Sequence, residues 1–543
     1  MQERFGGMDM STKKLPARRY HRTPRPLWAD AYTINGFAFE SKDATDSSEY
    51  YATFRKFPLP HEPMYNSADR RIVFAGLQGL CDLLLYEAFT HTEIDESVAF
   101  LKGRKACADG FRDFEFPETL WRKVVDECDG YLPLKIEGLP EGSVAYPGEP
   151  VIRVMSTRPG FGPLVPWFES VLLHVWAATE RLTAARHFMN YAYNMIRENE
   201  PATTSDDECM FFSRLMIHDF GARAANCPQE SELVAKMHNY VWFGTDTFAA
   251  AYQNWKNGAP PPMGSSVKAL AHRIVQGYEQ EFDCYQSMYD TAQNGEFLSM
   301  VGDCYDYWYA LENKLIPLAL KAKADGSGKV VVARPDSGDS VEMVIGTLRR
   351  ADEAGLMTEH LCADGLKRKA STTLRFIVGN GESFESVITI LKSCLEAGFV
   401  PWRCGIFGVG GHLRNNINRD HLSTKFALCA VGPKNRHVIK LSEERGKRTL
   451  PKVKVLRDSE ALKTGCTIVL PTEKPDVPDA LVTYYDGSSE SPFGPGFLDD
   501  FATIEARVIK GFLEMPMHGG ETSLDLDDEV EDLIQKYRHN LVG

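Results

Sequence analysis

The 543-residue sequence lacks the features that mark several specialised classes of protein. No apolar run reaches the roughly 18 residues that a membrane-spanning helix needs, and the N-terminus has no apolar signal core. The closest stretch, residues 164–178, is interrupted by Glu169 and His174. The net charge of −14 argues against a nucleic-acid-binding protein, which usually carries a basic face. We therefore expect neither a membrane nor a nucleic acid as a partner.

The 12 cysteines lack the spacing of a metal site or a disulfide scaffold. They are scattered from Cys81 to Cys466 without a CxxC pair. Reduced thiols in a cytoplasmic protein are the simplest account of this distribution. The sequence thus predicts a cytoplasmic location and no metal-ligating residues of its own.

The remaining composition is that of an ordinary globular protein, and the length suits two or three domains or one large enzyme. Shifts in pattern along the chain divide it into five expected segments. These are a flexible basic arm (1–26), the N-terminal part of a β-rich and helical domain (27–204), an α/β-barrel catalytic domain (205–431), a C-terminal β-rich part (432–521) and an acidic tail (522–543).

A regular alternation of apolar runs and helical patterns begins near residue 205. Six short runs each end in a cluster of Gly, Asp or Asn, at residues 216–218, 240–243, 297–301, 330–333, 375–378 and 403–407. Two following helices have clear boundaries, with Asp339 or Ser340 and Ser383 as N-caps, and Gly355 and Gly398 at the C-terminal ends. Repeated βα units predict an irregular α/β barrel with polar clusters at its mouth, beside a second, mostly β domain built from the N- and C-terminal segments.

The stretch KVVVARPDSGDSVEMV at 329–344 concentrates the chemistry of this pattern. It predicts a buried strand whose end presents Arg334 and Asp336, two residues apart. A guanidinium can grip a phosphate, and a carboxylate can accept hydrogen bonds from sugar hydroxyls. An ordinary Pro-Asp-Ser-Gly turn with a salt-bridged arginine explains this stretch equally well on its own.

A second candidate is the turn Gly408-Val409-Gly410-Gly411, which follows the last apolar run. Glycines such as Gly410 and Gly411 let backbone N–H groups approach an anion without obstruction by a Cβ atom. Arg419, eight residues beyond the turn, can supply a charge-assisted clamp. These residues predict a phosphate cradle, although Gly-rich turns are common.

Taken together, these motifs resemble those of the nicotinamide phosphoribosyltransferase family, a group of type II phosphoribosyltransferases. The likeness spans Asp30 to about Val431, and the motifs occur in the family's order. They are HDFGAR at 218–223, GTDT at 244–247, GDCYD at 302–306, RPDSG at 334–338 and FGVGG at 407–411. The resemblance implies an enzyme that joins nicotinamide to phosphoribosyl pyrophosphate, giving nicotinamide mononucleotide and diphosphate, and that works as a homodimer.

The resemblance also implies roles for single residues. Phe220 and Tyr32 match the two rings that sandwich nicotinamide, Tyr32 coming from the other subunit. Asp246 matches the carboxylate that receives the carboxamide N–H₂. The donor-side matches fall into three groups: diphosphate contacts (Arg223, His272, Arg334 and Arg55), ribose contacts (Arg334, Asp336, Gly379 and Asn380) and nucleotide-phosphate contacts (Gly410, Gly411 and Arg419). His272, Arg334 and Asp336 are the predicted catalytic residues.

Two cofactors follow from the same resemblance. Mg²⁺ is expected to accompany the diphosphate, and ATP is expected as an activator that phosphorylates His272. The sequence departs from the family pattern on this donor side. Asn380 stands where a ribose-binding Asp is expected, and a phosphate-binding Lys falls on Ala427, with Lys425 close by. Ala271 replaces the acidic residue before the histidine, which predicts that His272 lacks its usual orienting partner.

Two other functions remain open at this stage. A relative that uses ADP-ribose pyrophosphate would make NAD directly, and the altered donor side suits that reading. A catalytically weak binding or signalling protein is the other alternative, and the joint retention of Arg223, Asp246, Arg334, Asp336 and Arg419 speaks against it. We expect the acidic residues Asp219, Asp303 and Asp306 to be helix caps or supporting groups.

Overall fold

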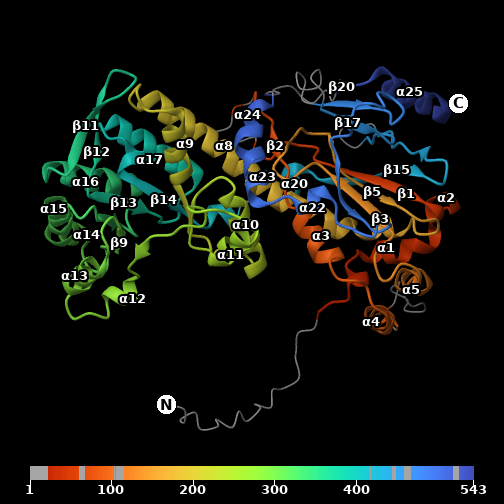
Figure 1. Cartoon of the computed structure of the whole chain (residues 1–543), viewed down its shortest axis with the longest axis horizontal. Coiled ribbons are helices and arrows are strands. Elements are labelled where there is room, and N and C mark those ends of the chain that lie inside the picture. The colour runs from red at the N-terminus through yellow and green to blue at the C-terminus, as the bar shows by residue number, and fades with distance from the viewer. Residues whose placement is uncertain are drawn as a thin grey trace, which may run out of the picture.

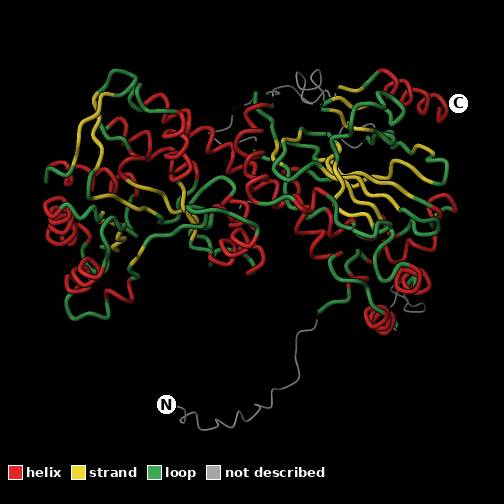
Figure 2. The backbone as a smooth tube through the Cα atoms, in the orientation of Figure 1, coloured by secondary structure: helices red, strands yellow, loops and turns green. Residues whose placement is uncertain are grey.

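The computed structural model describes residues 22–59, 66, 68–102, 104, 115–415, 418–442, 448–457, 466–515, 517 and 525–542. The chain forms two bodies, one built on an antiparallel sheet and the other on a parallel sheet, with the long helix α8 (Val175–Asn199) between them (Figure 1). Figure 2 shows the strands of each body gathered at its centre, with most helices around them.

The first body is organised around a six-stranded sheet. Its order is β16 (Arg436–His437), β15 (Lys425–Val431), β1 (Ser48–Thr53), β5 (Pro150–Ser156), β3 (Leu134–Gly138) and β19 (Val482–Asp486). All pairings are antiparallel. The strands come from N-terminal and C-terminal segments alike, which confirms the predicted second, mostly β domain.

Two small sheets complete this body. One pairs β2 (Ile72–Val73) with β4 (Val144–Ala145), and the other joins β17 (Lys454–Leu456), β18 (Thr467–Val469) and β20 (Asp525–Leu526). The helical segments are η1 (Arg25–Leu27), α1 (Ala31–Gly36), η2 (Phe37–Phe39), α2 (Lys42–Asp46), α3 (Leu77–Leu85), α4 (His91–Leu101), α5 (Glu118–Glu127), α6 (Leu164–Trp167), α7 (Glu169–Leu172), α22 (Pro495–Leu498), α23 (Phe501–Ala506), η5 (Arg507–Gly511), α24 (Phe512–Glu514) and α25 (Asp528–Val542).

The second body is a curled sheet of seven parallel strands, taken in chain order around the curl. They are β6 (Ile217–Asp219), β7 (Gly244–Thr245), β8 (Lys268–Ala269), β9 (Phe297–Val301), β10 (Val330–Arg334), β13 (Leu374–Val378) and β14 (Gly405–Val409). β14 pairs with β6, which brings the last strand beside the first. A single bridge between Gly244 and Ser265 joins β7 to the segment that leads into β8. This arrangement confirms the predicted irregular α/β barrel.

Helices surround this parallel sheet, as the repeated βα units predict. They are α9 (Asp206–Leu215), α10 (Pro228–Asn239), α11 (Phe248–Lys256), α12 (His272–Val275), α13 (Glu281–Thr291), α14 (Tyr307–Ala310), η3 (Leu311–Leu315), α15 (Ile316–Asp325), α16 (Ser340–Glu353), α17 (Phe384–Glu396), α18 (Pro401–Cys404) and α19 (His412–Asn415). The next helix, α20 (Arg419–Leu422), lies against the first body, where the carbonyl oxygen of Leu422 accepts from the backbone N–H of Arg55. A hairpin of β11 (Met357–Leu361) and β12 (Lys367–Ser371), which follows α16 in the chain and precedes β13, lies at the outer edge of this body (Figure 1).

The predicted boundaries of both helices are confirmed. Asp339 caps α16 by accepting from the backbone N–H of Glu342 at 2.9 Å, and Ser383 caps α17 with its hydroxyl. Gly355 and Gly398 follow the helix ends with φ of 73° and 87°. These left-handed conformations are easy for glycine and costly for other residues, so each helix stops there.

Other sequence expectations are wrong in detail. Residues 240–243 form a buried turn that leads into the short β7, and Arg403 lies within α18 instead of opening a strand. β8 consists of the exposed Lys268 and Ala269, so no apolar run marks it in the sequence. Its strand conformation depends on pairing with β9.

Segment boundaries also differ from the expected ones. The strand β15 falls within the range 205–431 expected for the barrel, but it pairs with β1 in the antiparallel sheet. Arg25, at the end of the expected flexible arm, is buried and bonds to Glu93, whereas residues 1–21 lie outside the described part of the chain. Within the acidic tail, β20 pairs with β18, and Val530 of α25 is fully buried.

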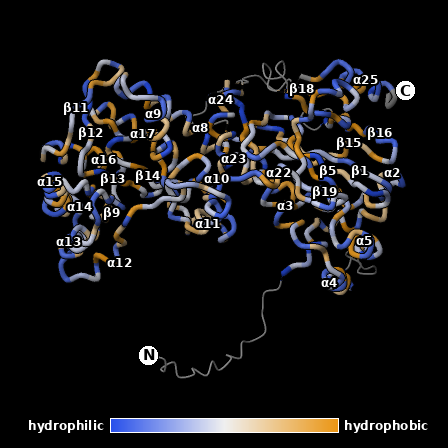
Figure 3. Tube along the Cα trace, viewed as in Figure 1, coloured by the Kyte–Doolittle hydropathy of each residue, from blue (hydrophilic) through white to orange (hydrophobic). Residues whose placement is uncertain are grey.

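The main hydrophobic core is continuous from the antiparallel sheet to the outer face of the barrel. α8 links these regions, since its Phe188 stacks on Phe384 of α17 at 4.4 Å between ring centroids and also lies beside Trp242. Figure 3 shows apolar stretches along the strands of the antiparallel sheet. Over the described residues, no helix is both long and apolar enough to cross a membrane.

Candidate functional site

The C-terminal ends of the seven parallel strands carry most of the predicted site residues. Such ends converge at one mouth of an α/β barrel, where ligands bind. Six of the strands contribute at least one of them: Phe220 and Arg223 after β6, Asp246 after β7, His272 after β8, Arg334 at the end of β10 with Asp336 after it, Gly379 and Asn380 after β13, and Gly410 and Gly411 after β14. β9 is followed by Asp303, which was expected only as a cap or supporting group. The fold therefore gathers residues that are distant in the sequence.

The half-buried ring of Phe220 lies on a floor of glycine backbone. A Cβ atom added to Gly408 would fall 2.1 Å from the ring, and one added to Gly379 would fall 2.8 Å away. Glycine is thus required at both positions for the ring to lie there. The ring also packs against the apolar interior of the barrel, which includes Val332 and Ile377. One face of the Phe220 ring is therefore covered by its own barrel.

Asp246, which follows the neighbouring strand β7, presents a half-exposed carboxylate, whose side chain is 48% accessible. Its Oδ1 lies 3.0 Å from Nε2 of the buried His218 and 2.6 Å from the hydroxyl of Ser266. Partial burial alone would raise the pKa of Asp246, but the hydrogen bonds from His218 and Ser266 outweigh it and lower the pKa. The carboxylate therefore stays ionised and is held in one orientation. His218 also lies 5.2 Å from the Phe220 ring centroid.

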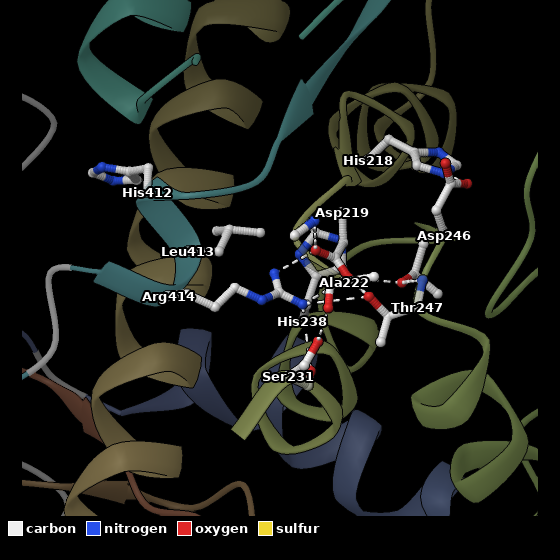
Figure 4. Close-up of polar contacts among 12 residues, drawn as sticks. His218, Asp219, Ala222, Ser231, His238, Asp246, Thr247, His412, Leu413 and Arg414 are labelled. Atoms are coloured by element: carbon white, nitrogen blue, oxygen red, sulfur yellow. Dashed lines mark hydrogen bonds and ion pairs between the residues drawn. The ribbon is translucent and has the colours of Figure 1, made fainter. Parts of the chain in front are cut away.

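A completely buried ion pair lies beneath these two residues. Asp219 and Arg414 have side chains with 0% exposure and bond to each other (Figure 4). Burial would raise the pKa of Asp219, but the hydrogen bond and charge of Arg414 outweigh it and lower the pKa to about 2. The neighbouring His238 donates from Nε2 to the carbonyl oxygen of Gly244, and burial lowers the pKa of His238 to about 4, so its ring is neutral.

His272 lies in the part of the barrel mouth where the phosphoribosyl donor is expected to bind. Its Nε2 lies 3.1 Å from Oδ1 of Asp303, and its Nδ1 lies 3.9 Å from Oδ2 of Asp336. The other oxygen of Asp303 accepts from the hydroxyl of Ser337 at 2.7 Å. The expectation that His272 lacks an orienting partner is therefore wrong, because Asp303 supplies one from the next strand. Asp306, by contrast, caps α14 as expected.

The remaining donor-side groups are cationic or polar. Arg334 donates to the carbonyl of Leu270 at 2.8 Å, and its buried Nε has no hydrogen-bond partner among the described residues. Arg223 and Asn380 are exposed at the same end of the barrel. Together with Asp336 they can bind an anion and a sugar.

Three predicted residues lie on the other body of the chain. Tyr32 on α1 is 66% exposed and lies beside Glu169, whose charge raises the pKa of the phenol. Arg419 on α20 is exposed, pairs with Asp420 and also feels the charge of Glu169. Arg55 follows β1 and donates to the carbonyl of Ser423. Figure 1 shows α1 far from the barrel strands, so Tyr32 and Phe220 of one chain do not face each other.

A local cationic group accompanies Arg55. Lys425 begins β15, and burial, with the nearby charges of Arg55 and Lys440, lowers the pKa of Lys425 to about 8. Lys425 and Ala427 are two residues apart on one strand, so their side chains point to the same face. Lys425 therefore lies on the face of Ala427, where its Nζ donates to the carbonyl oxygen of Arg448 at 2.6 Å.

Sequence reasoning missed several functional neighbours. His218 and Ser266 were not predicted to hold Asp246, and Arg414 was not predicted at all. His218 could have been found from the sequence, because it is a polar residue at the end of a predicted strand. Arg414 gave no signal, because it pairs with a residue 195 positions away.

No cluster of three or more His, Cys, Asp or Glu suited to a metal occurs in the part of the chain that the structure describes. Mg²⁺ commonly binds through one or two carboxylates together with substrate phosphates. Asp336 and Asp303 at the barrel mouth fit that donor set.

Comparison with known proteins gives a consistent result. The model of the nicotinate phosphoribosyltransferase (NAPRTase) family matches residues 215–458. A nicotinamide phosphoribosyltransferase of Xanthomonas campestris pv. campestris is 31% identical over 358 residues, which cover 65% of this chain and 72% of that protein. A nicotinamide phosphoribosyltransferase of Acinetobacter baylyi is 26% identical over 406 residues, covering 69% of this chain and 76% of that protein.

Two solved structures share the fold. Human nicotinic acid phosphoribosyltransferase superposes with a TM-score of 0.56 and 16% identity, covering 93% of this chain and 99% of the human chain. Nicotinate-nucleotide pyrophosphorylase from Pyrococcus furiosus superposes with a TM-score of 0.52 and 14% identity, covering 92% of this chain and 99% of that chain. At these identities the superpositions show a common fold.

Proposed function

The chain belongs to the nicotinate phosphoribosyltransferase family, and we propose that it joins nicotinamide to phosphoribosyl pyrophosphate, giving nicotinamide mononucleotide and diphosphate for NAD synthesis. The observation that carries the choice of base is the carboxylate of Asp246, held by His218 and Ser266 beside the ring of Phe220. An ionised carboxylate accepts hydrogen bonds from an amide N–H₂ and repels a second carboxylate. The pocket therefore suits nicotinamide and not nicotinate.

Positioning accounts for the attack by the base. Stacking on Phe220 orients the pyridine ring, and the bond to Asp246 fixes its rotation, so the ring nitrogen can face the ribose. That nitrogen carries no proton, so the reaction needs no general base. The protein's contribution to this half of the reaction is the fixed geometry of two side chains.

Charge stabilisation accounts for the departure of diphosphate. Breaking the bond from ribose C1 to diphosphate develops positive charge on the ribose and negative charge on the leaving group. Arg334 and Arg223 at the barrel mouth are suited to bind that leaving group, and Asp336 can accept from the ribose hydroxyls. Mg²⁺ brought by the diphosphate, with Asp336 and Asp303 as protein ligands, would neutralise part of the developing charge.

ATP is the second proposed cofactor. His272 lies at the mouth with Asp303 on one ring nitrogen and Asp336 near the other. A carboxylate that accepts from one nitrogen fixes the tautomer and leaves the other nitrogen free to attack a phosphoryl group. This geometry supports His272 as the phosphorylated residue.

A second copy of the chain is needed for the second aromatic wall. Phe220 covers one face of the base, whereas Tyr32 lies exposed on the distant body. A homodimer with shared sites brings Tyr32 of one copy to Phe220 of the other. Arg55 and Arg419, which lie on the same body as Tyr32, would then add positive charge to that site. No disulfide joins the eleven cysteines in the described part of the chain, which supports a reducing, cytoplasmic location.

Product analysis tests this function. The purified protein is incubated with nicotinamide or nicotinate, each with phosphoribosyl pyrophosphate or ADP-ribose pyrophosphate, and the products are identified by mass. We expect nicotinamide mononucleotide as the main product. An Asp336→Ala variant, which loses a ribose contact, is the negative control. NAD as the direct product would show that ADP-ribose pyrophosphate is the donor instead. The absence of any product would refute the proposed enzymatic activity.

A further inference from the structure

The ion pair of Asp219 and Arg414 lies beneath the proposed base pocket. Both side chains are completely buried. Removing two charges from water is costly, and the attraction between them often only offsets that cost. Arg414 lies in α19, directly after the Gly-rich turn of β14, and Asp219 ends β6. The pair thus joins the turn proposed to hold phosphate to the strand that carries Phe220.

The guanidinium of Arg414 contacts three separate segments (Figure 4). Nη1 and Nη2 both bond to the carboxylate of Asp219, with Nη2 at 3.1 Å from Oδ2. Nη2 also lies 3.3 Å from the carbonyl oxygen of Ser231 on α10 and 3.4 Å from the hydroxyl of Thr247. The planar fork of arginine can hold several acceptors in fixed directions, which a lysine ammonium on a flexible stem does less well.

The carboxylate of Asp219 extends this connection to both residues of the base pocket. It accepts from the N–H of Gly221 at 2.8 Å, from the hydroxyl of Thr245 at 2.8 Å and from that of Thr247 at 2.7 Å. Gly221 follows Phe220, and the two threonines flank Asp246. One carboxylate thus holds the neighbours of both side chains that face the base.

Packing leaves this assembly little freedom. A Cβ atom added to Gly221 would lie 2.2 Å from Nη1 of Arg414, so the guanidinium is in close contact with the backbone that follows Phe220. The contacts of the guanidinium with Asp219, Ser231 and Thr247 are all made at the barrel mouth, and none of them reaches the antiparallel sheet. A shift of Arg414 would move the loops of β6 and β7 together.

We propose that Arg414 is a positioning residue for base recognition, which acts through Asp219 to fix Phe220 and Asp246 relative to the Gly-rich turn. The inference rests on the proposed function and deepens it, since it assigns the orientation of the nicotinamide pocket to a residue that does not touch the base. If Arg414 only stabilised the fold, its replacement would lower stability and leave the KM for nicotinamide unchanged.

The chain offers a matched control at the other end of the same strand. Arg403 precedes β14 and pairs with the fully buried carboxylate of Glu200, with Nη2 at 2.6 Å from Oε2. Arg403→Met and Arg414→Met each remove one arginine from a buried carboxylate. Only Arg414 lies at the mouth. Thr247→Val is a milder variant, which removes the hydroxyl that donates to Asp219 and accepts from Arg414, and keeps the side-chain shape.

Steady-state kinetics and thermal unfolding separate the two roles. Arg414→Met should raise KM for nicotinamide about tenfold and KM for phosphoribosyl pyrophosphate by less, and Arg414→Lys should restore part of the loss. Thr247→Val should raise KM for nicotinamide about threefold. Arg403→Met should lower Tm and leave both KM values unchanged. Equal changes in KM for the two arginine variants, or none in Thr247→Val, would overturn the proposal.

Direct binding distinguishes a failure of this inference from a failure of the proposed function. Nicotinamide is titrated into the wild-type protein and the Thr247→Val variant by calorimetry, without any donor. If the wild type binds nicotinamide but makes no nucleotide, the proposed function fails, and weaker binding by Thr247→Val still supports the role of Asp219 and Arg414. Equal binding by both proteins overturns the inference. A wild type that does not bind nicotinamide overturns both.

Discussion

Phe220 lies in contact with the backbone of Gly408, so closely that a Cβ atom at Gly408 would fall 2.1 Å from the ring. The two residues come from adjacent strands, β6 and β14. The aromatic wall of the proposed nicotinamide pocket therefore depends on a glycine that lies far away in the sequence.

Gly408→Ala should displace the Phe220 ring and raise KM for nicotinamide by about tenfold or more. The reason is that the added Cβ atom, 2.1 Å from the ring, would overlap it unless the ring moved. Steady-state kinetics with varied nicotinamide measures the effect. Gly79→Ala is the control, because a Cβ there meets nothing within 4 Å and the residue lies in the helix α3. An unchanged KM in Gly408→Ala would show that the ring does not bind the base.

Asp246→Asn should narrow the preference for nicotinamide over nicotinate. The pKa of Asp246 is lowered in the folded protein, so the wild-type carboxylate is charged at neutral pH and repels that of nicotinate. Two carboxylates brought into contact in a poorly hydrated site repel each other by several kcal/mol, which lowers the affinity for nicotinate on the order of a thousand-fold. The ratio of kcat/KM for the two bases measures the change. Equal rates on both bases in the wild type would contradict this assignment.

His272→Ala should abolish labelling of the protein by γ-labelled ATP, and Asp303→Asn should reduce it about tenfold. The second effect is expected because the Asn amide cannot stabilise the histidine ring as the carboxylate does. Acid-labile phosphate on the protein is the measurement. Asp306→Asn is the matched control, since Asp306 caps α14 and is not bonded to His272. Full labelling of His272→Ala would place the phosphoryl group elsewhere.

Mixed dimers test the shared site. Tyr32→Ala and Asp336→Ala chains are each expected to be nearly inactive, because one removes the second aromatic wall and the other a donor contact. In a mixed dimer, one site receives both defects and the other receives neither. Mixing should therefore restore activity, up to about one quarter of the wild-type level per total site when the chains pair at random. No recovery after proven subunit exchange would argue for sites built from one chain.

Acid should remove the stability that Asp219 contributes. Its pKa falls from 3.8 to about 2 on folding, so the contribution is complete above about pH 4 and is lost as the pH falls toward 2. At about 1.4 kcal/mol per pKa unit, the loss is about 2 kcal/mol. Denaturant unfolding of the wild type and Asp219→Asn at several pH values measures it. The gap in unfolding free energy between the two should shrink over that range, and a constant gap would contradict the ionised pair.

Local features of the fold could be predicted from the sequence because they depend on a few neighbouring residues. Asp339 and Ser383 cap their helices with side chains that reach three residues ahead, and Gly355 and Gly398 end them with a conformation that glycine adopts easily. The apolar runs that became β9 and β10 are long enough to indicate buried strands. The polar residues that follow them then mark the mouth of the barrel.

The sequence by itself thus determined the caps, the long strands, the barrel class and the residues at its mouth. Only the tertiary structure decided that β15 joins the antiparallel sheet, that the exposed pair Lys268–Ala269 is a strand, that Asp303 orients His272 and that Arg414 pairs with Asp219. The physical reason is distance along the chain. Each of these pairings joins groups that become neighbours only when the strands assemble, and no local pattern of apolar or charged residues specifies the partner.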